Sequence, residues 1–138
     1  MMPVLRDLKE TCLYVDDIDR SKSFYRNVMG LTTLVEDNRF CAFDVAARHV
    51  LLIFSRGVSD QQTKLPGGTI PPHHGAGPIH AGFAVDAQDL PEWELHLTAH
   101  GVEILSRVSW PRGGESVYFR DPDGHLLELL TPGVWSTY

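Results

Sequence analysis

A single carboxylate stands among leucines near the end of the chain. Glu128 lies in HLLELL, residues 125–130, where the alternation of side chains predicts a β-strand. A buried carboxylate costs several kcal/mol unless a positive group lies beside it. We therefore expect a positively charged partner for Glu128.

The strand of Glu128 belongs to a predicted hairpin over residues 116–130. Its turn is DPDG, residues 121–124, in which proline presets φ for a type I turn and glycine accepts a positive φ. On the first strand, Ser116 and Tyr118 share a parity that can match the face of Glu128. Both are candidates for substrate contact, or else they form an ordinary polar side of the hairpin.

The elements that must position these residues form two similar halves. The first half predicts a strand, a helix and three strands, at about residues 8–16, 17–29, 32–36, 40–45 and 49–55. The second half predicts the same order, at about residues 80–86, 89–100, 102–107 and the hairpin 116–130. Between them, residues 57–78 are rich in glycine and proline and form a long connection, either a linker or a functional cover.

The two halves constitute an internal repeat. Glu10 corresponds to His80 on the first strand of each half, and Leu52 corresponds to Glu128 on the last. Strand alternation places these positions on the less apolar face of each half. Three of the four therefore carry side chains of the types that bind metals.

Composition limits the possible partners. The 138 residues are 43% hydrophobic and 22% charged, as in an ordinary globular chain. A net charge of -6 and scattered basic residues argue against nucleic acid and anionic lipid as partners. No apolar run is long enough for a signal peptide or a membrane span, so we expect a soluble cytoplasmic protein. Cys12 and Cys41 are expected to be buried, reduced thiols.

Three motifs carry a family resemblance: VDDIDRSxxFY after the first strand, HAGFAVD at the start of the second half, and YFRDPDGHLLEL near the end. With the β-α-β-β-β repeat, they resemble the vicinal oxygen chelate superfamily. That superfamily includes glyoxalase I, extradiol dioxygenases, fosfomycin-resistance proteins and bleomycin-binding proteins. The resemblance extends over about residues 8–132.

The resemblance implies an α+β fold of two tandem βαβββ modules that form a cupped mixed sheet with helices outside. One glyoxalase-like domain would cover residues 1–138, with modules at 8–56 and 79–132 joined by a linker loop at 57–78. It further implies a homodimer that acts on a small molecule.

A divalent metal ion in the cup is also implied, with Glu10, His80 and Glu128 as ligands carried over from the superfamily. Two carboxylates and an imidazole that converge remain costly without a cation, and a divalent ion removes that penalty. Such ligands suit Mn²⁺, Fe²⁺, Ni²⁺, Zn²⁺ or Mg²⁺. Three protein ligands leave room for a substrate with two oxygens.

Two subfamilies differ from this sequence in their metal ligands. Extradiol dioxygenases use two histidines and one carboxylate, whereas Glu10 stands where one of those histidines would be. Glyoxalase I uses a fourth ligand where this chain has Leu52. His73 and His74 in the long connection could compensate or cover the cup as a lid, but exposed loop positions are the simpler reading.

The fosfomycin-resistance proteins share the three-ligand arrangement. Ser116 matches a serine that contacts the phosphonate in that group, and Arg112 stands at the place of a lysine. Their first ligand is a histidine, however, and their basic C-terminal residues have no counterpart in VWSTY.

The leading hypothesis is a metal-dependent enzyme. It would be a glyoxalase-like lyase or isomerase, or it would add a thiol or water as fosfomycin-resistance proteins do; a dioxygenase fits less well. The candidate catalytic residues are Glu128 and Tyr118, and further candidates for moving a proton are Glu10, Glu36 and Glu103. The candidate substrate contacts are Ser116, Arg112, Phe40 and Phe54.

The other hypothesis is a non-catalytic binder of the bleomycin-resistance type. In that case the apolar positions Phe40, Leu52 and Phe54 would surround an aromatic or peptide-like drug. Such a binder has no need for Glu10, His80 and Glu128 in register, and this feature separates the two hypotheses.

Overall fold

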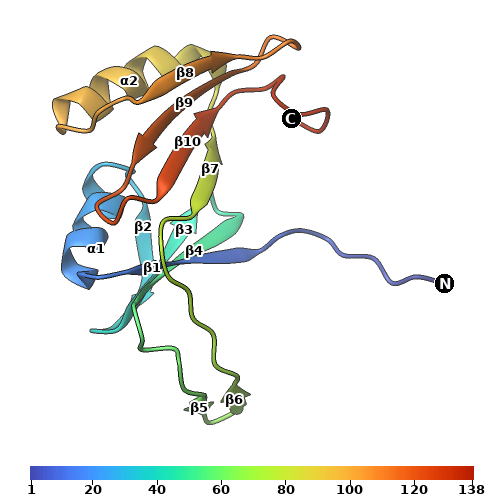
Figure 1. Ribbon diagram of the computed structural model, residues 1–138. Coiled ribbons are helices and arrows are strands. Elements are labelled where there is room, and N and C mark those ends of the chain that lie inside the picture. The colour runs from blue at the N-terminus through green and yellow to red at the C-terminus, as the bar shows by residue number, and fades with distance from the viewer. The chain divides into compact units, whose positions relative to one another are not determined.

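The computed structural model describes residues 1–138 and contains two units, Met1–Ala76 and Gly77–Tyr138. Each unit has one four-stranded mixed sheet and one α-helix (Figure 1). Neither helix has the length and apolar character that crossing a membrane would require.

The first unit follows the predicted element order. Its elements are β1 Glu10–Val15, α1 Ile18–Asn27, β2 Thr32–Glu36, β3 Phe40–Val45 and β4 His49–Ser55. The sheet order is β1-β4-β3-β2, in which β1 runs parallel to β4 and the other pairs are antiparallel. Strands β2, β3 and β4 have the bounds that the sequence predicts.

Helix α1 begins and ends at the signals that the sequence carries. Asp17 is the N-cap, and its Oδ1 accepts a hydrogen bond from the backbone N–H of Arg20 at 3.1 Å. After the helix, Gly30 adopts a φ of 72°, which an L side chain rarely tolerates. The helix packs on the sheet over buried side chains, and each of these contributes about 1.5–3 kcal/mol; they include Leu13, Val15, Tyr25, Phe43 and Ile53.

The second unit repeats this architecture. Its elements are β7 His80–Ala84, a 3₁₀ turn Ala87–Asp89, α2 Leu90–Ala99, β8 Ser106–Ser109, β9 Glu115–Arg120 and β10 Leu126–Leu130. The sheet order β7-β10-β9-β8 matches that of the first unit element by element. Cys12 pairs with Leu52 in the first unit as Gly82 pairs with Glu128 in the second, which confirms the predicted equivalence of Leu52 and Glu128.

One predicted strand, at residues 102–107, is wrong in its position. Strand β8 begins only at Ser106, because the backbone of Val102 still serves the end of α2. The N–H of Val102 donates to the carbonyl of Leu97 at 2.9 Å, next to Gly101 with its φ of 74°. Asp89 is the N-cap of α2, but its side chain makes no capping hydrogen bond.

The predicted hairpin turn is confirmed. The N–H of Gly124 donates to the carbonyl of Asp121 at 3.0 Å, and Gly124 has a φ of 83°. His125 is buried after the turn, and its Nδ1 accepts a hydrogen bond from the N–H of Ile79 at 3.0 Å. His125 therefore holds the entry to β7 against the turn.

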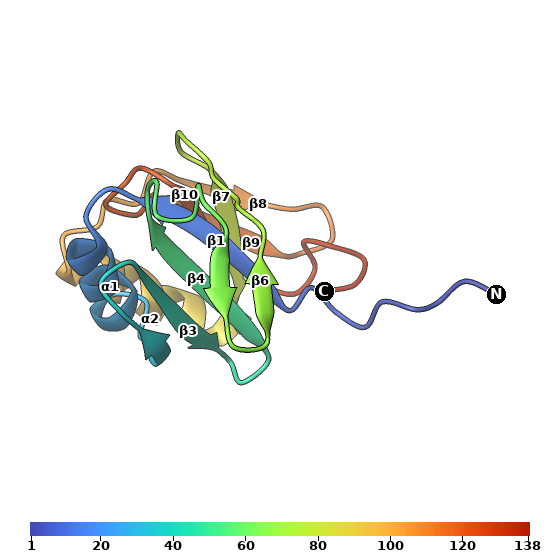
Figure 2. The same ribbon diagram turned by 90° about the horizontal axis from the view of Figure 1, so that it is seen from below.

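The long connection contains a small hairpin that no sequence pattern predicts. Strands β5 Thr63–Leu65 and β6 Gly68–Ile70 pair antiparallel around Pro66 and Gly67. Figure 1 shows the hairpin at the tip of the connection, set apart from the first sheet, and Figure 2 shows both of its strands from below. Residues 57–76 of the connection thus belong structurally to the first unit.

Candidate functional site

Two of the predicted metal ligands meet in the second unit. His80 on β7 directs Nε2 at Oε1 of Glu128 on β10, at a distance of 3.2 Å. The other ring nitrogen, Nδ1, lies 2.8 Å from the backbone carbonyl of Leu126. Because a carbonyl oxygen only accepts hydrogen bonds, Nδ1 carries a proton, and Nε2 of a neutral ring presents its lone pair to the carboxylate.

This geometry fits a cation. A lone pair and a carboxylate oxygen at 3.2 Å repel each other unless a proton or a metal ion satisfies both. Histidines that bind metals commonly donate their second ring N–H to a backbone carbonyl, as His80 does to Leu126. The His80 side chain is 50% exposed and that of Glu128 only 10%, so the pair is open to solvent on the histidine side.

Glu128 is held in place by a chain of hydrogen bonds from Trp110, which follows β8, and from Ser116 on β9. The indole Nε1–H of Trp110 donates to Ser116 Oγ at 2.8 Å, and the Ser116 hydroxyl donates to Glu128 Oε2 at 2.5 Å. Ser116 is fully buried. One carboxylate oxygen is therefore occupied, while Oε1 remains directed at His80.

Trp110 is a functional residue that the sequence reasoning missed. Its position just after β8 carries no motif, and only the need of a half-buried indole N–H for a hydrogen-bond acceptor would have pointed to Ser116. Ser116 was expected to contact substrate. The structure places its hydroxyl against Glu128 and Trp110.

Gly82 leaves the space around the carboxylate open. It pairs with Glu128 in the parallel ladder between β7 and β10. A side chain at this position would begin 3.7 Å from Glu128 Oε1 and 3.1 Å from Leu130 Cδ2. The sequence gives Gly82 no evident role, because the absence of a side chain is informative only when the neighbouring side chains are known.

Tyr118 lies beside the same pair. It is the cross-strand partner of Glu128, and its ring stacks near that of His80 with centroids 6.4 Å apart. Burial, and next the negative charge of Glu128, raise the pKa of Tyr118. The phenol therefore stays protonated at neutral pH and suits a hydrogen-bond donor better than a general base.

The remaining candidates of the second unit lie outside this cluster. Arg112 is exposed in the turn between β8 and β9, which closes with a hydrogen bond from Trp110 N–H to the Gly114 carbonyl at 2.8 Å. Glu103 is exposed between α2 and β8. Neither residue forms a hydrogen bond or an ion pair with His80 or Glu128, and their predicted roles remain predictions.

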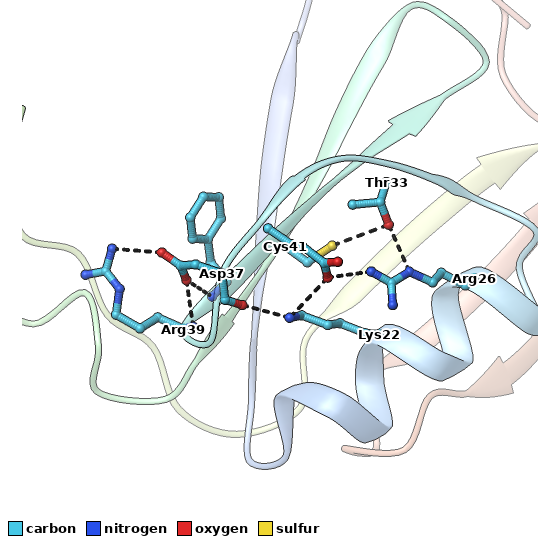
Figure 3. Close-up of polar contacts among 8 residues, drawn as sticks. Lys22, Arg26, Thr33, Asp37, Arg39 and Cys41 are labelled. Atoms are coloured by element: carbon cyan, nitrogen blue, oxygen red, sulfur yellow. Dashed lines mark hydrogen bonds and ion pairs between the residues drawn. The ribbon is translucent and has the colours of Figure 1, made fainter.

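Glu36, in the first unit, is engaged in an ion-pair cluster. Lys22 and Arg26 on α1 converge on its carboxylate at the end of β2, with Lys22 Nζ at 3.1 Å (Figure 3). These two cations lower the pKa of Glu36. The carboxylate thus connects the helix to the edge strand, and a proton-transfer role is disfavoured.

The first unit contains a cavity of about 580 Å³. It is lined by Glu10, Phe40, Leu52 and Phe54, together with residues of the connection. The candidate metal ligand Glu10 and the candidate substrate contacts Phe40 and Phe54 therefore share one cavity. The less apolar face of β1, as predicted, is the face that lines it.

Tyr14 and His73 complete this cavity. The Tyr14 hydroxyl lies 2.7 Å from His73 Nδ1, and the His73 ring meets Phe54 edge to face at 4.8 Å. Burial, and next the hydrogen bond with Cys12, raise the pKa of Tyr14 to about 12. Of the two histidines considered for a lid, His73 faces the cavity and His74 is exposed.

Glu10 belongs to the first unit, whereas His80 and Glu128 belong to the second. Within either unit, no three His, Cys, Asp or Glu side chains gather into a metal-binding group. The structure therefore brings together two of the three predicted ligands, and the complete set remains a prediction.

The chain matches the family model of the Glyoxalase/Bleomycin resistance protein/Dioxygenase superfamily over residues 7–129. It belongs to that superfamily. This match confirms the predicted resemblance, and the solved structures that share the fold confirm the predicted α+β class of paired βαβββ modules.

Within the superfamily, the chain is similar to metallothiol transferases FosB. It is 30% identical to the protein of Bacillus licheniformis over 88% of this chain and 72% of that one. It is 26% identical to the protein of Staphylococcus saprophyticus over 93% of this chain and 78% of that one. These relatives agree with the expected class, a metal-dependent superfamily protein that acts on a small molecule.

Two solved structures with folds similar to that of this chain are those of a lyase and of a fosfomycin-resistance protein. Lactoylglutathione lyase from Agrobacterium tumefaciens superposes with a TM-score of 0.85 and 31% identity, over 94% of this chain and 96% of that one. The fosfomycin-resistance protein FosX of Listeria monocytogenes superposes with a TM-score of 0.67 and 22% identity, over 93% of this chain and 94% of that one.

Proposed function

We propose that the protein is a divalent-metal-dependent enzyme that adds a thiol, or water, to a small oxygen-bearing electrophile. Its metal ligands would be His80 and Glu128, with Glu10 as the third. The observation that carries this proposal is the position of His80 Nε2, 3.2 Å from Glu128 Oε1, while Nδ1 faces the Leu126 carbonyl. The similarity to metallothiol transferases supports the thiol as one reactant.

The bound metal would supply Lewis acidity at the substrate oxygen. The protein's own residues would prepare the site. The Leu126 carbonyl selects the tautomer of His80, and the Ser116 hydroxyl fixes the rotation of the Glu128 carboxylate. Gly82 leaves room beside that carboxylate for a substrate atom.

In the overall addition, sulfur bonds to the electrophilic carbon, the carbon–oxygen bond breaks, and the proton of the thiol ends on that oxygen. Tyr118 carries a proton at neutral pH and lies beside Glu128. We assign Tyr118 the role of hydrogen-bond donor to the oxygen on which negative charge develops.

A lyase or isomerase reaction of the glyoxalase type is the second candidate. The similarity to lactoylglutathione lyase favours it. Leu52, a half-buried apolar residue in the first-unit cavity, counts against it, because it occupies the repeat position of Glu128 and supplies no fourth ligand. Assays of both reactions on the metal-loaded protein discriminate the two candidates.

Metal analysis of the purified protein tests the metal site directly. We expect stoichiometric divalent metal in the wild type and loss of metal in Glu128→Ala and His80→Ala. Glu103→Ala, which removes an exposed glutamate, is the matched control and should retain the metal. A wild-type protein that never takes up a stoichiometric divalent ion contradicts the proposal.

We also propose that the protein is a homodimer, as the superfamily resemblance implies. Light scattering coupled to size-exclusion chromatography should then give twice the 15.4 kDa mass of one chain. A monomeric mass across the accessible concentration range would contradict this part of the proposal.

A further inference from the structure

The cavity of the first unit has aromatic walls. Phe40 and Phe54 stack with ring centroids 5.8 Å apart and an interplanar angle of 21°. Tyr14 lies next to Phe54, with centroids 6.4 Å apart, and His73 meets the same ring edge to face. Three strands of one sheet and the connection thus present ring surfaces to one space.

Two hydrogen bonds between Ser59 and His73 join the two arms of the connection beside this cavity and form its base. The N–H of His73 donates to the Ser59 carbonyl at 2.9 Å, and the Ser59 hydroxyl donates to the His73 carbonyl at 2.6 Å. The hydrogen bond between Tyr14 and His73 then joins this base to β1. Gly75 packs on the Tyr14 ring so closely that a Cβ there would lie 2.7 Å from Tyr14 Cε2.

The hairpin carried by this base supplies a further wall. Leu65 on β5 and Ile70 on β6 line the cavity together with Pro71. In Figure 2 the hairpin overlaps β1 and β4 in projection, and Figure 1 shows it set apart from the sheet. An organic group in the cavity would contact the sheet on one side and side chains of the hairpin on another.

The cavity offers little positive charge that could attract an anion. Its charged lining residues are Glu10 and Arg39. The Arg39 guanidinium pairs with Asp37 at 3.3 Å (Figure 3), so its charge is already partly neutralised. In the metal-free protein, a phosphonate or other anion in this cavity would meet the negative charge of Glu10, with Arg39 already paired to Asp37.

The volume also favours an organic group. Ligand pockets commonly measure about 300–1,000 Å³ and are lined by apolar and aromatic side chains. The cavity of about 580 Å³ lies within that range. Aromatic walls attract a flat ring through stacked and edge-to-face contacts.

We propose that this cavity binds an uncharged aromatic group of the substrate, between Phe54 and the β5–β6 hairpin. The inference rests on the proposed function in that it takes Glu10, at the edge of the same cavity, as a metal ligand. The substrate class is then an aryl-bearing small molecule whose oxygens project toward Glu10, rather than a compact phosphonate.

Fluorescence titration of the metal-free protein with N-phenyl-1-naphthylamine tests this inference. This uncharged aromatic probe becomes bright in apolar surroundings. We expect saturable binding to the wild type, and a Kd raised about tenfold or more in Phe54→Ala through loss of ring contact. Trp135→Ala removes an aromatic side chain that is 66% exposed on the second unit, and it should leave the Kd unchanged.

A second variant addresses the fastening of the connection without removing a ring. Tyr14→Phe keeps the aromatic wall but deletes the hydroxyl that joins His73. We expect severalfold faster release of the probe in stopped-flow measurements. Thermal unfolding establishes that each variant is folded; should Phe54→Ala fail to fold, Phe54→Leu replaces it and should also weaken binding.

The inference is overturned if the wild type shows no saturable binding, or if folded Phe54 and Trp135 variants bind the probe alike. The outcome is separable from that of the proposed function, because the titration uses chelator-treated protein. If the protein binds the probe but never takes up metal, the proposed metal-dependent enzyme is refuted and the proposed aromatic binding cavity stands.

Discussion

The two units use one β-α-β-β-β scaffold for different purposes at equivalent positions. Where the parallel strands pair, the first unit sets Cys12 beside Leu52 and the second sets Gly82 beside Glu128. Leu52 lines an aromatic cavity, whereas Glu128 is a buried carboxylate directed at a histidine. The shared backbone determines where the side chain lies, and the side chain alone determines whether the place attracts apolar groups or a cation.

The units also differ in how the helix is joined to the edge strand. In the first, the cations Lys22 and Arg26 on α1 pair with Glu36 on β2. In the second, the acid Glu94 on α2 pairs with Arg107 on β8. The helix and the edge strand exchange the signs of their charges between the units, but an ion pair joins them in both. This indicates that the geometry of the scaffold matters more than the sign of each charge.

The largest effect on metal affinity is expected when Glu128 of the second unit is replaced by leucine, the residue at the equivalent position of the first unit. Glu128→Leu copies Leu52 and removes a proposed ligand, so we expect metal affinity to fall beyond the range of isothermal titration calorimetry. Leu52→Met, an apolar exchange at the equivalent position, should leave metal affinity unchanged. Metal affinity retained by Glu128→Leu would end the proposed division of roles between the units.

A smaller effect is expected from the hydrogen-bond chain that has no counterpart in the first unit. Ser116→Ala leaves Glu128 Oε2 without its donor and Trp110 Nε1 without its acceptor. Loss of such a supporting group lowers metal affinity about 10- to 100-fold. Titration with Mn²⁺ and Zn²⁺ measures this, and an unchanged affinity would reduce Ser116 to a packing role.

Gly82, which pairs with Glu128 where Cys12 pairs with Leu52 in the first unit, provides a third comparison. Gly82→Val places an apolar side chain, which cannot bind a metal, near Glu128 Oε1 and Leu130. We expect metal affinity to fall about tenfold, because the added side chain crowds the carboxylate that faces His80. Ala84→Val adds the same bulk on the same strand face two residues away and should bind metal as the wild type does; equal losses in both variants would refute the crowding argument.

The smallest effect concerns the ion pairs of the first unit. The folded state lowers the pKa of Glu36, so its contribution to stability is present above the unfolded pKa and is lost as pH falls through the folded value. In Glu36→Gln, the free energy of unfolding should therefore depend less on pH in the acidic range. Urea unfolding across that range measures the difference, with Glu103→Gln as the control that should match the wild type.

Much of the fold was predictable because its signals are local. Alternation located β3 and β4, and the DPDG turn located the hairpin that carries Glu128. The start of β8 was not predictable, because the hydrogen bond between Val102 and Leu97 extends the helix end into a run that alternates like a strand. The β5–β6 hairpin was missed since its three-residue strands are too short for periodicity.

By itself, the sequence determined the repeat, the face on which Glu10, His80 and Glu128 lie, and the absence of a carboxylate at Leu52. These follow from a side-chain period of two, which any regular strand obeys. Only the tertiary structure decided that Trp110 and Ser116 hold Glu128, and that Tyr14 and His73 fasten the connection over an aromatic cavity. Those contacts join separate elements, and the distance between separate elements is set by packing rather than by any local pattern.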